Sequence, residues 1–219
     1  GAFLSSSWWP AEHSISSRPV AQLPEGQIVL LRRDSSVLVG VATDLESNDL
    51  VRAVGAQVPA VMLASTSKDS THRVAILVGT VGGHFVARGM IKPLPSVIGV
   101  EFADSGKTPA ARLRFGVRPP KALVAMGKTD RDVSAPALLI RSDRLDQRVT
   151  TDAALDLLST SVSFQRTDGM TVYWESYGYS AGDTVSVAVW VERYTPQGLM
   201  RRFTNSLSLT RDLNTPVVV

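Results

Sequence analysis

The sequence predicts an all-β protein, built of tandem immunoglobulin-like β-sandwich units behind an extended N-terminal arm. Seven short apolar segments, separated by turn residues at regular intervals, lie between residues 27 and 117. Further along, residues 170–193 (MTVYWESYGYSAGDTVSVAVWVER) alternate their side chains with a period of two, which is the period of a strand. A single continuous sandwich is the alternative architecture.

The composition is typical of a globular chain. Hydrophobic residues make up 44% of the 219 residues, which is enough for a core. The formal net charge is only +3, and the basic residues are scattered among acidic ones, so we expect no nucleic-acid partner. The absence of cysteine excludes disulfides, zinc thiolate sites and cysteine nucleophiles. No run of about 18 apolar residues occurs, so we expect no transmembrane segment.

Residues 1–26 are predicted to form an extended docking arm, since they contain three prolines and show no periodicity. Leaving their large apolar side chains in water costs about 1.5–3 kcal/mol each. The arm either packs on its own domain or docks on another protein, where tryptophan is a typical anchor. Two later arginines suit the polar rim of such an interface. The predicted partner-binding residues are Phe3, Leu4, Trp8, Trp9, Pro10, Arg201 and Arg202.

The first predicted domain spans residues 27–120. Its first two strands, QIVLLRR (27–33) and VLVGVAT (37–43), are expected to form a hairpin around Asp34-Ser35-Ser36. Gly82-Gly83 is a strong turn signal between two later strands. The other five expected strands are 58–64, 72–80, 84–91, 96–103 and 111–117.

The stretch from Arg118 to Pro136 is rich in Pro, Lys, Asp and Gly, and residues 121–135 within it are the predicted linker, with one short strand at 122–126. The second predicted domain covers residues 136–219. We expect a helical turn at 150–159 and a β-hairpin at 170–193, whose loop is Gly178 to Asp183. The remaining expected strands of this domain are 136–143, 161–166 and 199–210.

In that hairpin, Val172, Trp174 and Ser176 are expected on one face, with Trp174 in the core. Thr171, Tyr173, Glu175 and Tyr177 are expected on the other face. Glu175 lies among tyrosines, so we expect it to bond neighbouring backbone or hydroxyl groups. The alternative is a carbohydrate-binding platform of Tyr173, Trp174, Glu175, Tyr177 and Tyr179, in which the aromatic faces stack on sugars.

No set of residues predicts a catalytic centre, so we expect neither an enzyme nor a bound cofactor or metal. The tripeptide Gly106-Lys107-Thr108 lacks the glycine of a phosphate-binding loop, because Glu101 stands at that position and a strand follows, so we expect a hairpin turn. The histidines His13, His72 and His84 lie at or beside turns or strand starts, where a solvated imidazole is usual. The carboxylate pairs Asp143/Asp146 and Asp152/Asp156 are interpreted as solvated loop charges.

The run from Val172 to Gly178 (VYWESYG), with Ser142-Asp143 after an APALLI strand, resembles a group of bacterial proteins. It is similar to the C-terminal β-rich half of secreted or envelope proteins of Gemmatimonadota that often carry a GWxTD-type domain. Tyr179 stands where that group favours leucine, and a looser similarity reaches back to Leu31–Ser35, so the resemblance covers about residues 27–193. The GWxTD signature is absent. No catalytic residues are established for the group, so none carry over.

The resemblance implies a periplasmic protein, peripheral to the membrane. One specific case is an extrinsic subunit of a phototrophic reaction-centre and light-harvesting complex. Since the chain begins with Gly1, an upstream segment is expected to have been removed or not included, and a cleaved secretory signal is one explanation. We therefore expect a non-catalytic structural or docking subunit on the periplasmic face of a membrane protein assembly. The alternative is an envelope module that binds carbohydrate or peptidoglycan through the aromatic hairpin.

Overall fold

The computed structural model confirms the all-β prediction, because most of the residues it describes lie in strands of antiparallel sheets. The chain forms two compact units, Gly1–Tyr179 and Ser180–Val219, which are described separately. The described residues are 21–22, 26–44, 57–66, 70–80, 84–103, 109–140, 149–161, 171–180, 182–186, 190–191 and 217–218.

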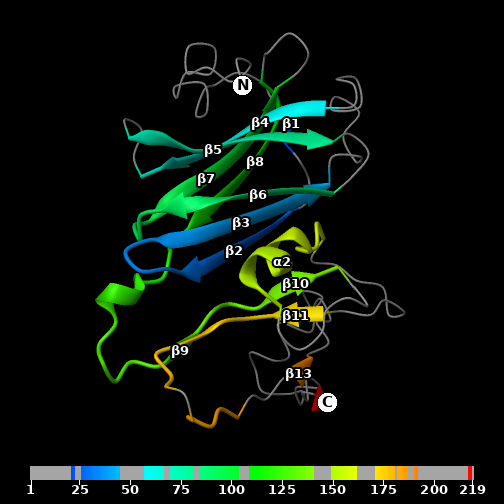
Figure 1. Ribbon diagram of the computed structural model, residues 1–219. Helices are drawn as coiled ribbons and strands as arrows, with labels where there is room; N and C mark the ends of the chain where they lie inside the picture. Colours follow the sequence, from blue (N-terminus) through cyan, green and yellow to red (C-terminus); the bar gives the residue numbers. More distant parts are fainter. Residues whose placement is uncertain are drawn as a thin grey trace, which may run out of the picture. The chain divides into compact units, whose positions relative to one another are not determined.

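Two sheets form the body of the first unit (Figure 1). The smaller sheet has the order β2-β3-β6, and the larger has the order β1-β8-β7-β4-β5. Neighbouring strands run antiparallel, except that β1 pairs parallel with β8. Strands β2 to β8 confirm the seven predicted strands to within two residues at each end. The bounds are β1 (Ala21–Gln22), β2 (Gln27–Arg32), β3 (Val37–Asp44), β4 (Gln57–Ser65), β5 (Thr71–Thr80), β6 (His84–Ile91), β7 (Ser96–Ala103) and β8 (Pro109–Val117).

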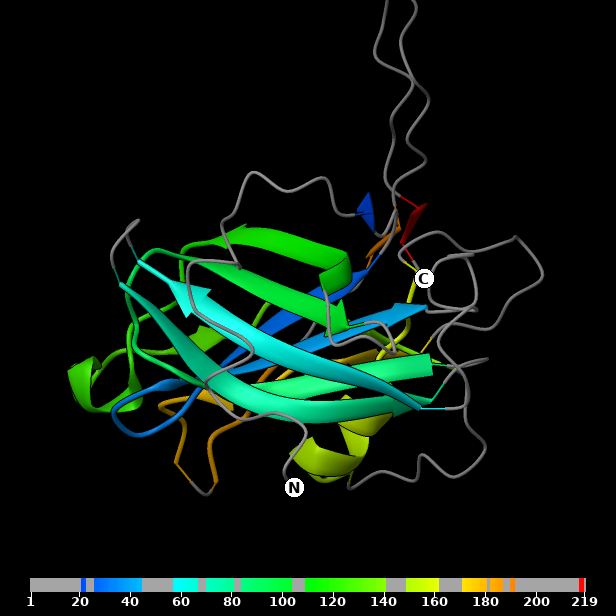
Figure 2. The ribbon, with the colours of Figure 1, turned by 90° about the horizontal axis from the view of Figure 1, so that it is seen from above.

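The main hydrophobic core lies between the two sheets. It takes residues at alternate positions of β3, β4, β6, β7 and β8, as a period of two requires when one face is buried. Phe85 of β6 meets Phe102 of β7 edge to face, with ring centroids 4.9 Å apart. In Figure 2, which views the sheets from above, their strands run at an angle to one another. The larger members of this core are Val37, Val39, Val41, Met62, Phe85, Ile91, Ile98, Val100, Phe102, Leu113 and Val117.

The smaller sheet also buries its second face. Against it pack the short helix α2 (Thr151–Asp156) and the strand β10 (Ala137–Leu139). Gly40 allows this close approach, because a Cβ there would lie 2.7 Å from Cδ2 of Leu155. The smaller sheet is therefore a middle layer, with the larger sheet on one side and α2 with β10 on the other (Figure 1). This second core contains Val29, Leu31, Ala42, Ala137, Leu139, Ala154, Leu155 and Leu158.

Residues 122–126, predicted as a short strand, form the 3₁₀ helix η3 (Leu123–Ala125) instead. The backbone N–H groups of Leu123 and Val124 donate to the carbonyls of Arg33 (3.1 Å) and Asp34 (2.9 Å). These two hydrogen bonds fix the segment to the β2–β3 turn. A strand at this position would instead have needed a neighbouring strand as its hydrogen-bonding partner. The expected helical turn at 150–159 is confirmed as α2. The division between the two compact units falls after Tyr179, and the domain boundaries expected at residues 27, 121 and 136 stay predictions.

The hairpin predicted for residues 170–193 is wrong, because its strands pair elsewhere. Strand β11 (Thr171–Tyr173) pairs with β10, and β12 (Ser176–Tyr177) pairs with β9 (Asp132–Val133). In the second unit, β13 (Trp190–Val191) pairs with β14 (Val217–Val218). Alternation identifies a strand, but its partner depends on distant segments that offer a free edge. The strands expected at 161–166 (beyond Ser161) and 199–210 lie outside the described residues.

Two glycines in the expected loop adopt positive φ angles. Gly178 has φ +76°, and a Cβ there would lie 2.1 Å from the carbonyl oxygen of Asp130. Gly182 has φ +103° with open space around it. In the second unit a turn joins Ser180 to Asp183, whose carboxylate accepts a hydrogen bond from the Ser180 N–H at 2.7 Å. The predicted reversal of the chain near these glycines is therefore present at residues 180–183.

Candidate functional site

The most organised polar cluster of the first unit surrounds the carboxylate of Glu175, which lies between β11 and β12. Arg33 donates two hydrogen bonds to it, from Nη1 to Oε2 at 2.8 Å and from Nη2 to Oε1 at 3.0 Å. Three hydroxyls also donate to the carboxylate, from Thr151 (2.7 Å), Tyr173 (2.9 Å) and Tyr177 (2.8 Å). The two oxygens thus accept five hydrogen bonds, which fills their lone pairs.

These donors come from separate elements. Arg33 follows the last residue of β2, and Thr151 is the first residue of α2. Tyr173 and Tyr177 share a face with Glu175, because residues two apart in an extended chain point the same way. The backbone of Glu175 is fixed too, since its N–H donates to Oγ of Ser134 and its carbonyl accepts from the Ser134 N–H. The expectation that Glu175 bonds neighbouring hydroxyl groups is confirmed.

Arg32 extends the cluster along β2. Its backbone N–H donates to the hydroxyl of Tyr177 at 3.0 Å, and its guanidinium lies 5.6 Å from the centre of the Tyr177 ring. The same guanidinium pairs with Asp132 of β9 and donates to the carbonyl of Lys121. Tyr177 is buried, with 7% of its surface exposed. Its hydroxyl both accepts a hydrogen bond, from Arg32, and donates one, to Glu175.

The surroundings control the ionisation of these groups. Burial raises the pKa of Glu175, but the hydrogen bonds from Arg33, Thr151, Tyr177 and Tyr173 outweigh it and lower the pKa to about 2. The hydrogen bonds that Arg33 donates to Glu175 raise the pKa of Arg33. Burial, with Glu175 nearby, raises the pKa of Tyr177 and of Tyr173. At neutral pH the cluster therefore contains a carboxylate, a guanidinium and two neutral phenols.

This arrangement suits a structural junction better than acid–base chemistry. A general acid or base works best with a pKa near the working pH, whereas Glu175 ionises far below it. Its lone pairs are already used, so a substrate would have to displace an existing partner. What the cluster does is join β2, α2, β11 and β12 through one carboxylate.

A second buried carboxylate lies in the larger sheet. Glu101 of β7 is 2% exposed and faces Arg112 across the β7–β8 ladder. Its Oε1 lies 3.7 Å from Nη2 of Arg114, a nitrogen that is buried and makes no hydrogen bond. Burial lowers the pKa of Arg114. The charges of Glu101 and Arg114 therefore compensate each other only in part within the sheet.

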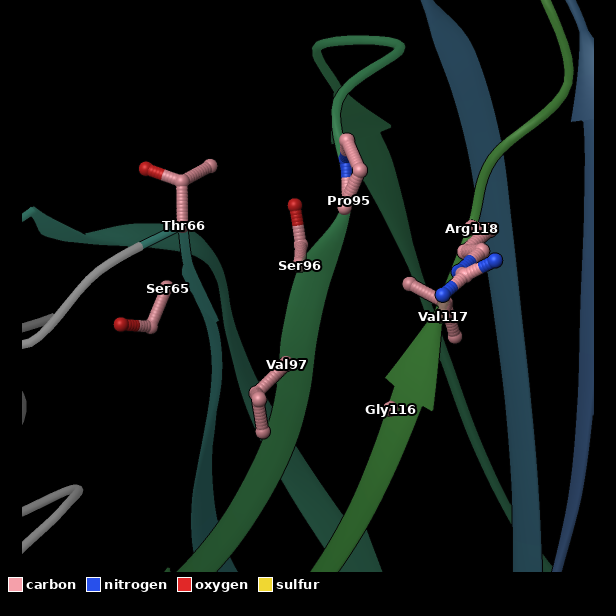
Figure 3. A pocket seen from close by; sticks show the side chains of 8 residues that line it. All are labelled: Ser65, Thr66, Pro95, Ser96, Val97, Gly116, Val117 and Arg118. Carbon is pink, nitrogen blue, oxygen red and sulfur yellow. The ribbon is translucent and has the colours of Figure 1, made fainter.

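A surface hollow of about 350 Å³ lies where β4 ends, β7 begins and β8 ends. Figure 3 shows Pro95, Ser96 and Val97 between Ser65 and Thr66 on one side and the segment from Gly116 to Arg118 on the other. The hollow is separate from the Glu175 cluster in sequence and in lining residues.

The residues predicted for partner binding, Phe3, Leu4, Trp8, Trp9, Pro10, Arg201 and Arg202, lie outside the described residues, as do His13, Asp143, Asp146 and Gly106-Lys107-Thr108. The segment after that tripeptide is strand β8, as predicted. Asp152 and Asp156 are solvent-exposed, as expected, although they lie on α2 and face Arg88 at 3.1 and 3.4 Å. His72 and His84 are exposed on β5 and β6.

The structure corrects the expectations for two aromatic residues. Trp174, expected in the core, is 37% exposed, because the tyrosine face of this segment is the buried one. Tyr177, counted among the sugar-stacking candidates, is buried. Arg33, Thr151 and Ser134 were not predicted as partners of Glu175. Two adjacent arginines at a strand end were the available signal for Arg33, since the second of them needs a counter-charge if it is covered.

No known protein family, curated protein or solved structure matches this chain. Across the segments that the structure describes, no helix has the length and apolar character needed to cross a bilayer. The same segments contain no group of three His, Asp or Glu side chains placed to hold a metal ion.

Proposed function

We propose that this protein is a non-catalytic structural or docking subunit on the periplasmic face of a membrane protein assembly. The observation that supports this most is the Glu175 cluster. The best-organised polar group of the described residues uses all its hydrogen-bonding capacity inside the chain, which favours a rigid scaffold. A scaffold of this kind presents its surface and its ends to a partner.

The anchor in this proposal is the N-terminal arm with Phe3, Leu4, Trp8, Trp9 and Pro10, supplemented by Arg201 and Arg202. Near the end of the predicted arm, β1 pairs with β8 at Ala21↔Ala111, so the arm is tied to the edge of the larger sheet at that point. An arm held firmly at its base loses less entropy on docking than one that leaves from a mobile segment.

The periplasmic location, and a photosynthetic reaction-centre and light-harvesting complex as the assembly, rest on the resemblance to envelope proteins of Gemmatimonadota. Tandem immunoglobulin-like units belong to this proposal as well. They stay a prediction, since the second unit is described only by a short strand pair and a turn.

Deletion of residues 1–12 tests the anchor. This deletion leaves β1 and both sheets in place, so we expect an unchanged unfolding transition but loss of the protein from membrane complexes purified in mild detergent. A matched control carries Trp174→Ala, which removes an exposed tryptophan outside the arm. Retention of the truncated protein at full occupancy would refute the anchor.

An envelope carbohydrate-binding module is the second candidate. It is favoured by Trp174 and Tyr179, which are 37% and 39% exposed, while Arg131 lies 5.7 Å from the centre of the Tyr179 ring. Exposed aromatic rings are able to stack on sugars. On this reading, Trp174→Ala and Tyr179→Ala abolish retention on purified peptidoglycan while the fold survives. No retention of the parent protein on peptidoglycan or other envelope polysaccharide would end this candidate.

A further inference from the structure

The hollow at the end of the larger sheet is formed by three neighbouring strands in register. Ser65 of β4 pairs with Val97 of β7, and Val97 pairs with Gly116 of β8. These three residues therefore form one row across the sheet, and Arg118 follows two residues after Gly116. This row therefore places the hydroxyl of Ser65, the side chain of Val97 and the backbone of Gly116 near the guanidinium of Arg118 (Figure 3).

Gly116 leaves the floor of the hollow open. A Cβ at this position would meet no atom within 4 Å, so the glycine is not required by crowding. Its backbone does not adopt a positive φ either. The volume of about 350 Å³ falls within the range of about 300–1,000 Å³ that is usual for small-ligand sites.

The polar groups around the hollow differ in what they offer. Ser96 is only 9% exposed, and its hydroxyl already donates to the carbonyl of Leu94 at 2.7 Å. Oγ of Ser65 accepts from the hydroxyl of Thr71, and the hydroxyl of Thr66 is bonded to that of Ser70. Arg118 is exposed and has no ion pair within the described part of the chain. The guanidinium is thus the principal donor of the hollow, and it is cationic.

The remaining lining is apolar. Val97 is 45% exposed, although it lies in the middle of a sheet, and Pro95 is exposed near it, whereas Val117 is 8% exposed and belongs to the main core. A ligand that fits this lining combines an anionic acceptor for Arg118 with a small apolar body for Val97. A carboxylate next to a branched side chain has this combination.

We propose that the hollow binds a carboxylate attached to a small branched apolar residue, as found at the C-terminus of a peptide. The carboxylate pairs with Arg118, and the side chain covers Val97 over the open floor at Gly116. This site is independent of the N-terminal arm, so it goes beyond the proposed docking function.

The test is a titration of the full, isotope-labelled chain with N-acetyl-L-valine and with N-acetyl-L-valine amide, followed by two-dimensional NMR. We expect the acid to shift the backbone amides of Val97, Gly116 and Val117, and the amide to bind at least about tenfold more weakly. A fluorescent peptide ending in valine, with a free or an amidated C-terminus, then distinguishes a peptide end from a free acid. Binding of the acid alone assigns the site to free carboxylic acids.

Arg118→Gln should weaken binding of the acid at least about tenfold, because it removes the charged donor. Lys92→Gln is the matched control, since it removes an equal charge from an exposed side chain outside the lining and should leave affinity within about twofold. Gly116→Val should abolish binding by filling the floor. Unchanged thermal unfolding confirms that each variant is folded. If Gly116→Val does not fold, the comparison of Arg118→Gln with Lys92→Gln decides the test.

Three results would overturn the proposal. The first is the absence of any shift at the hollow with the acid or with the peptide. The second is equal binding of the acid and its amide, which would exclude recognition of the carboxylate. The third is an equal loss of affinity in Arg118→Gln and Lys92→Gln, which would show a general effect of net charge.

Discussion

Arg33 and Glu175, 142 residues apart in the chain, form a two-pronged ion pair with N–O distances of 2.8 and 3.0 Å. The side chains are largely covered, at 28% and 14% exposure. Planar guanidinium and carboxylate groups match in this geometry, which makes such pairs stronger than single contacts. The pair connects the turn after β2 to the segment between β11 and β12. It therefore closes the layer formed by α2, β10 and β11 onto the smaller sheet.

Glu175→Gln should lower the free energy of unfolding by about 3 kcal/mol. The amide keeps the shape of the side chain but leaves Arg33 without a counter-charge, and its NH₂ group faces donors. Urea denaturation measures the loss. Asp152→Asn is the control, because it breaks an exposed pair with Arg88 and should cost less than about 1 kcal/mol. Equal losses in the two variants would contradict a special role for Glu175.

The stabilisation by Glu175 should depend on pH in a defined window. Its pKa falls from an ordinary 4.5 to about 2 in the folded chain, so the folded state favours the ionised form. The contribution is complete above about pH 4.5 and is lost as the pH falls towards 2. The difference in unfolding free energy between the parent protein and Glu175→Gln should therefore shrink across this window. A difference that stays constant from pH 5 to pH 2 would refute the lowered pKa.

The strands were predictable where the pattern is local. In β3 the run VLVGVA does not alternate, and such runs indicate burial on both faces, which is how β3 lies between α2 and the larger sheet. The period of two also placed Tyr173, Glu175 and Tyr177 on a common face. The period did not determine which of the two faces is buried. The expectation that Trp174 lies in the core was therefore wrong, since this side chain lies at the surface.

Pairing between distant segments was not predictable from the pattern. The alternation in strand β11 is sufficient to recognise it as a strand. Its pairing with β10, however, is determined by the shape of the second core and not by the residues of β11. Arg33 similarly gives no local sign that its partner lies beyond residue 170. A period describes one strand, whereas a partner depends on which free edge and which unpaired charge the rest of the chain presents.

Tyr177→Phe should destabilise the fold by about 2 kcal/mol. The change removes the hydrogen bond to Glu175 and leaves the buried N–H of Arg32 without its acceptor. Denaturation midpoints measure the effect. Tyr179→Phe is the matched control, since this ring is 39% exposed and its loss of a hydroxyl should change stability by less than about 0.5 kcal/mol. If Tyr177→Phe is as stable as the parent, the hydroxyl does not join β12 to β2.

Gly178→Ala tests the sharp turn that follows β12. Gly178 has φ +76°, which costs an L-residue about 1–2 kcal/mol, and a Cβ there would lie 2.1 Å from the carbonyl oxygen of Asp130. Because that oxygen belongs to the backbone, the contact is relieved only by moving residues 130–132, and with them the pairing of Asp132 and Tyr177. We expect a loss of more than about 2 kcal/mol.

Gly182→Ala separates the two causes. Gly182 also has a positive φ, at +103°, but a Cβ there meets no atom within 4 Å. The substitution should therefore cost only the backbone strain, about 1–2 kcal/mol. Thermal unfolding, with hydrogen exchange at the amide of Tyr177 as the local readout, should show faster exchange in Gly178→Ala alone. Equal unfolding and equal exchange in both variants would mean that the approach of Gly178 to Asp130 does not hold β9 against β12.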